Sequence, residues 1–235
     1  MAYIYYKKNY SPPKKKPKNK VLATIVFSFG ILIFASAVLP IIRFQLEYSI
    51  KFGQIVNPLS SANYNRNGSI LGEISTDYSQ LNNWFTDSKI ETPTISTQHT
   101  SYTISIPKLK IDQAVVEIGS LDLKNSLIQY PQTALPGQLG NSVVFGHSVL
   151  PQFFNPKSYL TIFSTLYRLK PGDEIFVNFD NIQYKYLVEE MFEVQPTDLS
   201  ILEQRFDNRY FSMVTCSPPG TYLRRLVVKT RIADF

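Results

Sequence analysis

The chain has 235 residues, and its 44% hydrophobic and 14% aromatic content is typical of a folded protein with one or two small domains. Its formal net charge is +6, but residues 1–20 hold seven lysines and no acidic residue, so the excess positive charge belongs to this tail. Because a nucleic-acid-binding domain needs its Lys and Arg on the folded part, this distribution argues against one. One cysteine, Cys216, excludes a disulfide framework and a multi-cysteine zinc site, and two histidines, His99 and His147, are too few for a His-rich metal centre, so we expect no metal and no cofactor.

The N-terminal segment has the pattern of a membrane anchor. Residues 1–20 are rich in Lys and Pro and show neither helical nor strand periodicity, so we interpret them as a basic cytoplasmic tail. Residues 21–42 run uncharged up to Arg43, and because about 20 apolar residues suffice to cross a bilayer, we predict a transmembrane helix over residues 21–43. Lysines before this helix and few positive charges after it predict a single-pass protein with a cytoplasmic N-terminus. The helix would contact membrane lipid, and the lysines could also contact anionic headgroups.

A cleavable signal peptide is the alternative interpretation of this segment. Ala35, Ser36 and Ala37 resemble a small-residue cleavage site. The apolar sequence continues to Ile42, however, and exceeds the usual signal core of about 7–15 residues, which favours a retained anchor.

After the anchor the sequence changes character twice. Residues 44–100 contain Asn, Ser and Thr clusters, which indicate an extracellular stalk or linker with some short helix around Ser79 to Phe85. Residues 101–235 contain short alternating or apolar runs between turns such as KPGD and PPGT, and this spacing predicts an all-β sandwich or barrel. The candidate strands are YTISIP, QAVVEI, SVVFGH, EIFVNF, IQYKYLVEEMFEV, YFSMVTC and RLVVKTRI. Short helices are predicted at 120–127 and 198–204, where an Asp stands near the start of each run.

Cys216 is the first candidate for chemistry, although a lone cysteine is more often a small buried hydrophobe. It ends a strand-like run and precedes a Pro-Pro-Gly turn. In the period-2 pattern of that run, Phe211 and Met213 share one face and Cys216 lies on the other. Because the bulky apolar pair should face the core, we expect Cys216 to face outward and to reach solvent.

A thiol needs a base or a nearby cation to become a good nucleophile. His147 ends another strand-like run, whereas His99 lies in the polar stalk, so His147 is the candidate base; a surface or hydrogen-bonded histidine is the alternative. Alternation in the last run places Arg225 on the outer face and Arg224 in phase with the core residues. A guanidinium at Arg225 would favour the thiolate and could stabilise an oxyanion, although a plain surface arginine is the alternative.

These motifs occur in one order along the β domain. FGHS surrounds His147, Thr215 precedes Cys216, and PPGT and then Arg225 in the run RLVV follow. In these residues the chain resembles the sortase family of membrane-anchored cysteine transpeptidases. The spacing of nine from Cys216 to Arg225 and the run TALPGQLGNSVVFGHS are most similar to class D and class E members. The resemblance covers about residues 101–235, and the layout of anchor, stalk and β domain also matches.

The resemblance implies a catalytic domain over residues 101–235, with an eight-stranded barrel in which His147, Cys216 and Arg225 meet in a groove. Cys216 would attack the Thr–Gly bond of an LPXTG-like sorting signal, and His147 would protonate the leaving amine and later deprotonate the incoming one. The acceptor would be a cell-wall precursor or a pilin lysine. Arg225, helped by Thr215, would hold the substrate and the oxyanion, and a preformed thiolate–imidazolium pair would make a separate base unnecessary.

The chain also departs from the family pattern. Class D and E members often carry a charged sequence after the histidine, whereas Ser148 to Pro151 follow here, and neither an acidic calcium cluster nor an evident lid motif is visible. An L,D-transpeptidase is excluded because its histidine directly precedes the cysteine. The remaining alternative is a catalytically inactive, membrane-anchored β-barrel module that binds cell-wall or protein ligands.

Overall fold

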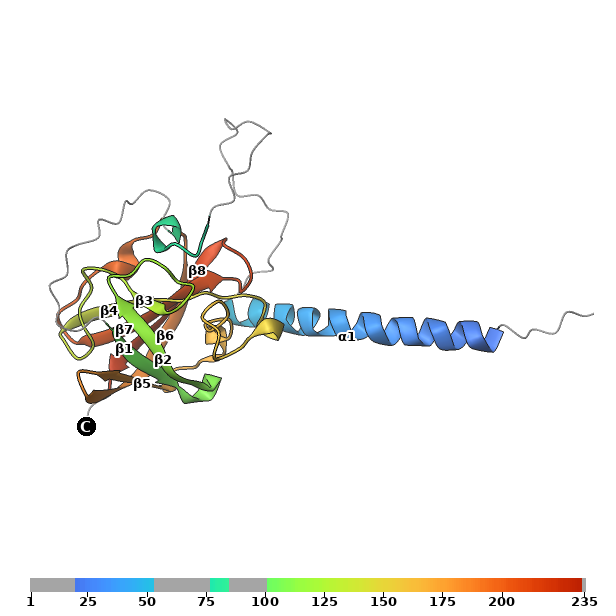
Figure 1. The fold of residues 1–235 in the computed structure, drawn as a ribbon, viewed down its shortest axis with the longest axis horizontal. Helices are drawn as coiled ribbons and strands as arrows, with labels where there is room; N and C mark the ends of the chain where they lie inside the picture. The colour runs from blue at the N-terminus through green and yellow to red at the C-terminus, as the bar shows by residue number, and fades with distance from the viewer. Residues whose placement is uncertain (1–19, 53–76, 85–100, 234–235) are drawn as a thin grey trace, which may run out of the picture. The chain divides into compact units, whose positions relative to one another are not determined.

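The N-terminal part of the chain forms one long helix. The computed structural model describes residues 20–52, 77–84 and 101–233. Helix α1, Lys20–Phe52, contains the predicted span, and within the described residues it is the helix long and apolar enough to cross a membrane (Figure 1). The chain divides into two compact units between Phe44 and Gln45, so the last turns of α1 belong to the same unit as the β domain. The stalk predicted over 44–100 is otherwise described only at 77–84.

The strands that the structure describes close into an eight-stranded barrel, which confirms the predicted fold class (Figure 1). Their order around the barrel is β1-β2-β3-β4-β7-β8-β6-β5, in which β2–β3 and β4–β7 are parallel pairs and the others antiparallel. The strands are β1 Ser101–Ile106, β2 Ile111–Ile118, β3 Leu127–Gln129, β4 Gly140–Phe145, β5 Glu174–Phe179, β6 Ile182–Val194, β7 Arg209–Ser217 and β8 Arg224–Ile232.

Alternating apolar side chains fill the barrel, as the strand pattern predicts. On β7, Phe211 and Met213 are fully buried on the inner face, and their β8 neighbour Val228 is too. Each such side chain contributes about 1.5–3 kcal/mol through burial. The inner set consists of Ile104, Ile106, Val116, Val144, Ile175, Val177, Tyr186, Val188, Phe211, Met213, Leu226 and Val228.

The short helices follow the sequence prediction only in part. The 3-10 helices are η1 Leu81–Trp84, η2 Pro107–Leu109, η3 Pro151–Phe153, η4 Leu166–Arg168 and η5 Ser200–Leu202. Two of them, η1 and η5, fall where short helix was predicted. The helix predicted at 120–127 is wrong, because that stretch forms turns and then enters β3. Ile128 of β3 pairs with Glu117 of β2, and this tertiary pairing overrides the local helical spacing.

Candidate active site

Strands β7 and β8 bring Cys216 and Arg225 together. The two residues are direct antiparallel partners at the ends of their strands, on the face of the barrel opposite to Phe211 and Met213. The connecting turn contains Gly220 at φ +83°, a left-handed conformation that glycine adopts without steric cost. The alternation predicted from the sequence therefore holds for this pair.

His147 stands beside this pair because β4 runs parallel to β7. The Thr215 hydroxyl donates to the carbonyl oxygen of Gly146 (2.7 Å), and the Ser148 hydroxyl donates to that of Cys216 (2.8 Å). The residues on both sides of His147 are thus bonded to the strand that carries the thiol. A side chain at position 146 would meet Leu127 Cδ2 at 2.5 Å, so only glycine allows this strand end to pack so closely.

A segment from the predicted stalk covers the site. Residues 77–84, here called the cover, are joined to residues 121–123 by backbone hydrogen bonds from Leu81 N to Leu121 O and from Leu123 N to Ser79 O, both 2.9 Å. Leu81 and Trp84 pack into one apolar cluster with Cys216. The cover closes the outer face of the barrel over the thiol.

Trp84 lies between His147 and Arg225. Its ring centroid is 6.0 Å from that of His147, and the Arg225 guanidinium carbon is 5.1 Å from its ring. The Arg225 side chain donates to the carbonyl oxygens of Trp84 (2.7 Å), Tyr222 (3.2 Å) and Arg224 (3.1 Å). Tyr222 in turn stacks on Tyr78 of the cover at 3.9 Å. The guanidinium therefore holds the cover and the β7–β8 turn together.

The expectation that Cys216 reaches solvent is wrong, and Arg225, although it lies on the expected outer face, is buried as well. Each is 1% exposed, because the cover buries the outer face of β7 while the barrel core buries the inner face. Local alternation identified the correct face, but a segment distant in sequence determines whether that face meets water. His99 lies outside the described residues.

Burial also sets the protonation of the candidate pair. Burial raises the pKa of the Cys216 thiol to about 11, with Arg225 opposing the shift, and it lowers the pKa of His147. Asp77 and Asp122 act on His147 in the opposite direction. Both shifts favour a thiol and a neutral imidazole in the covered site over a preformed thiolate–imidazolium pair.

Two buried polar atoms of the site have no hydrogen-bond partner within the part of the chain that the structure describes. They are Nε of Arg225 and Nε2 of His147. An unsatisfied buried polar atom costs about 1–3 kcal/mol, and both of these atoms have the capacity to bond with a further group.

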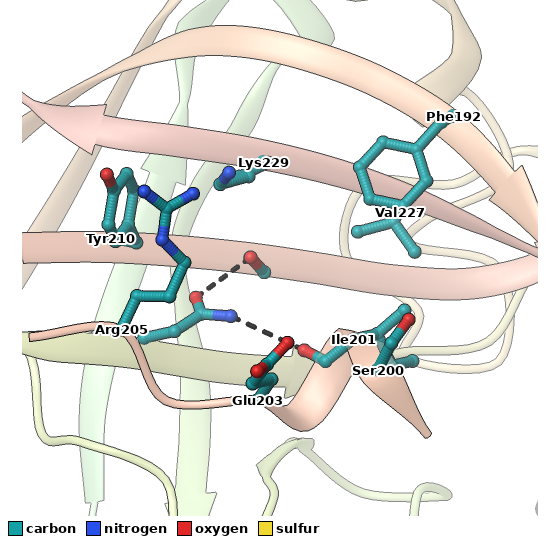
Figure 2. A pocket seen from close by; sticks show the side chains of 10 residues that line it. Phe192, Ser200, Ile201, Glu203, Arg205, Tyr210, Val227 and Lys229 are labelled. Carbon is teal, nitrogen blue, oxygen red and sulfur yellow. Dashed lines mark hydrogen bonds between the residues drawn. The ribbon is translucent and has the colours of Figure 1, made fainter. Parts of the chain in front are cut away.

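A pocket of about 220 Å³ lies farther along the same face of the barrel (Figure 2). Figure 2 shows Phe192 and Val227 at one end, Arg205, Tyr210 and Lys229 at the other, and Ile201 and Glu203 of the β6–β7 connection along one side. Ser212 and Lys229, a direct pair of β7 and β8, also line it. This pair is four residues from the Cys216 pair, or about 13 Å at roughly 3.3 Å per residue.

The described fold is a closed β-barrel with Cys216, His147 and Arg225 at the ends of neighbouring strands. The sortase domain family model matches residues 104–233, which is more than half of the chain. The chain therefore belongs to the sortase family and is a cysteine transpeptidase. The family predicted from the sequence is confirmed, and the assignment to class D or E stays a prediction.

Solved sortase structures are similar to the chain. A sortase D5 transpeptidase from Clostridium perfringens is 27% identical, with 57% of this chain and 79% of that chain covered and a TM-score of 0.49. A lid mutant of sortase A from Corynebacterium diphtheriae is 25% identical, with coverages of 61% and 75% and a TM-score of 0.50. Sortase C-1 from Actinomyces oris is 23% identical, with coverages of 66% and 92% and a TM-score of 0.52. A search of curated protein sequences gave no match.

Sequence reasoning missed three residues of the site. Trp84 was placed in the stalk, although a lone tryptophan three residues after Leu81 could have indicated a buried turn. Ser148 was read only as a departure from the family, yet its hydroxyl holds the Cys216 carbonyl. No sequence pattern singles out Tyr222 as a site residue, apart from its position in the turn after Cys216.

Proposed function

We propose that the protein cleaves an LPXTG-like sorting signal between Thr and Gly and transfers the acyl part to an amine of the cell surface, from a cell-wall precursor or a pilin lysine. The observation that supports this most directly is the pair of unpartnered atoms, Arg225 Nε and His147 Nε2, beside the Cys216 thiol. A peptide carbonyl would accept a hydrogen bond from the guanidinium, and a thiol or an amine would exchange its proton with the imidazole.

Substrate must displace the cover, because Cys216 is 1% exposed. Displacement lets water reach the thiol and the imidazole, which lowers the pKa of Cys216 and raises that of His147. His147 then takes the thiol proton, and the positive charge of Arg225 favours the resulting thiolate. Opening of the cover and formation of the nucleophile are thus one event.

The chemistry then proceeds in two transfers. Cys216 Sγ attacks the Thr carbonyl carbon, and the N–H groups of Arg225 stabilise the oxyanion that forms. His147 gives its proton to the Gly amine as the C–N bond breaks, which leaves a thioester. An acceptor amine attacks this thioester, His147 takes a proton from it, and the thiolate leaves. Thr215, whose hydroxyl holds Gly146, supports the geometry between the two strand ends.

The pocket in Figure 2 gives the substrate a place upstream of the scissile bond. A separation of about 13 Å is spanned by roughly four residues of extended peptide. Phe192 and Val227 offer an apolar wall at the end of the pocket nearer to the thiol. We assign the pocket to the first residues of the sorting signal.

The N-terminal part supports a location at the cell membrane. We propose a cytoplasmic tail over 1–20, a single membrane span over 21–43 and an extracellular domain that follows the stalk predicted over 44–100. Seven lysines before the span favour this orientation, and α1 would contact lipid along its exposed apolar side chains. The catalytic domain predicted over 101–235 would then meet its substrates outside the cell.

The test uses the full-length chain in detergent micelles with a fluorogenic LPXTG-type peptide and a library of related peptides. We expect cleavage with a thioester at Cys216 visible by mass spectrometry, and no turnover by Cys216→Ala. Equal turnover by that variant would refute the mechanism. An inactive wild-type chain whose thiol alkylation rate does not respond to replacement of His147 or Arg225 would favour the binding-module alternative.

A further inference from the structure

A buried carboxylate lies beside the residue that follows the candidate nucleophile. The Glu193 side chain is 7% exposed. Its Oε1 accepts hydrogen bonds from Ser217 Oγ (2.5 Å) and from the Tyr48 hydroxyl, and the two hydroxyl groups contact each other. Arg224 Nη1 is 4.0 Å from the other carboxylate oxygen, at the limit of an ion pair. Two hydroxyl groups thus solvate a charge that is removed from water.

One of these hydroxyl groups comes from the end of α1. Tyr48 is 2% exposed, and its ring packs edge-on against Tyr167 with centroids 6.0 Å apart. One turn later, Lys51 Nζ donates to the carbonyl oxygens of Leu169 (2.6 Å) and Tyr167. Because residues 45–52 belong to the same compact unit as the barrel, these are contacts within that unit.

These contacts connect the end of α1 to the segments that adjoin Cys216 and His147. Ser217 directly follows Cys216 and pairs with Arg224 at the start of the β7–β8 turn. Tyr167 belongs to η4, which closes the segment in which Phe163 N donates to the His147 carbonyl oxygen (3.0 Å). The end of α1 therefore contacts β7, which carries the thiol, and η4, which ends the segment bonded to the histidine.

We propose that Tyr48 is a positioning residue for the reaction: through Glu193 and Ser217 it fixes the strand end that presents Cys216 and Arg225. The proposal rests on the proposed function, since it assumes that these two residues act on substrate. Removal of the Tyr48 hydroxyl leaves Glu193 with one donor fewer and leaves Ser217 held by Glu193 alone, so this strand end and the turn are less firmly positioned.

The test compares Tyr48→Phe with Tyr186→Phe in the full-length chain in detergent micelles. Tyr186 is a matched control, because it is also buried and its hydroxyl accepts one hydrogen bond, from Gly137 N (2.9 Å). For Tyr48→Phe we expect faster alkylation of Cys216 by iodoacetamide, because a less firmly held β7–β8 turn exposes the thiol more often. We also expect kcat for peptide cleavage to fall about tenfold at unchanged KM, the effect of one hydrogen bond lost to a charged group. Tyr186→Phe should leave alkylation, kcat and KM at wild-type values.

Alkylation requires no substrate, so the alkylation assay tests the positioning role of Tyr48 even if the proposed function fails. A wild-type alkylation rate in Tyr48→Phe would overturn it, as would an equal rise in Tyr186→Phe, which would indicate general loosening. With an active wild-type chain, an effect of Tyr48→Phe on KM alone would also contradict a positioning role. Circular dichroism at the assay temperature checks that both variants remain folded.

Discussion

Truncation of Trp84 tests the link between the cover and the reactivity of the thiol. Trp84→Ala removes the ring that lies between His147 and Arg225 and the indole hydrogen bond to the Tyr78 carbonyl, so the end of the cover over the thiol is held by the residue 84 carbonyl bond to Arg225, while the backbone bonds to residues 121–123 and the Tyr78–Tyr222 stack hold the rest. Because Trp84 packs on the outside of the barrel, its loss should release the cover without unfolding the strands. Water would then reach Cys216.

The magnitude follows from the pKa of the thiol. Rehydration returns the Cys216 pKa from about 11 toward its ordinary value of 9.0. A fall of this size raises the thiolate fraction at neutral pH by about 100-fold. A less basic thiolate is also less nucleophilic, which offsets about tenfold of that gain. Alkylation of Trp84→Ala should therefore be about tenfold faster than that of the wild type, and improved access would add to this.

The assay is iodoacetamide labelling of Cys216 in the full-length chain, followed by mass spectrometry. Trp84→Phe is the matched control, since it keeps an aromatic ring in the cover and should react close to the wild-type rate. An unchanged rate in Trp84→Ala would refute the argument that the cover controls the thiol. Trp84 is also the only tryptophan of the chain. A sorting peptide that displaces the cover should therefore shift the emission of Cys216→Ala to longer wavelength.

Three further predictions concern the site and its packing. Gly146→Ala places a Cβ 2.6 Å from Phe163 Cδ2, so we expect a loss of about 1–3 kcal/mol in unfolding free energy together with slower cleavage; a wild-type melting temperature would contradict this. Arg225→Lys keeps the charge but loses the planar fork, and kcat should fall about 100-fold or more, whereas a small effect would show that charge alone suffices. Because the folded thiol keeps its proton up to a pKa of about 11 while the unfolded thiol loses it near 9.0, the stabilisation from Cys216 is complete below 9.0 and is lost as pH rises toward 11. Denaturant unfolding should show this loss as an excess of up to about 3 kcal/mol in the wild type over Cys216→Ala, because the buried tyrosines, whose pKa values are also raised, contribute equally to both chains.

The strands and the candidate residues could be predicted because they depend on local patterns. Alternation along the β7 sequence separates Phe211 and Met213 from Cys216, and the structure keeps this separation. The run after the turn likewise places Arg225 opposite Cys216. By contrast β3 has only three residues, too few to show a period, and its first residue, Leu127, falls at the end of the predicted helix.

The covered state of the site could not be predicted in this way. Burial of Cys216 depends on Trp84, which is separated from it by more than 100 residues of the chain. Local sequence around residues 77–84 is mostly polar and indicates only a short helix. Nothing in that stretch specifies which surface its two apolar side chains will meet.

The sequence by itself determined the family, the all-β class, the apolar N-terminal helix and the face on which the thiol lies, because each depends on a motif or a short-range period. Only the tertiary structure decided that burial under the cover raises the pKa of Cys216, that Ser148 and Thr215 join the two strand ends, and that Tyr48 reaches Glu193. The physical reason is that solvation depends on everything that surrounds a group, and most neighbours of these side chains are far from them in sequence.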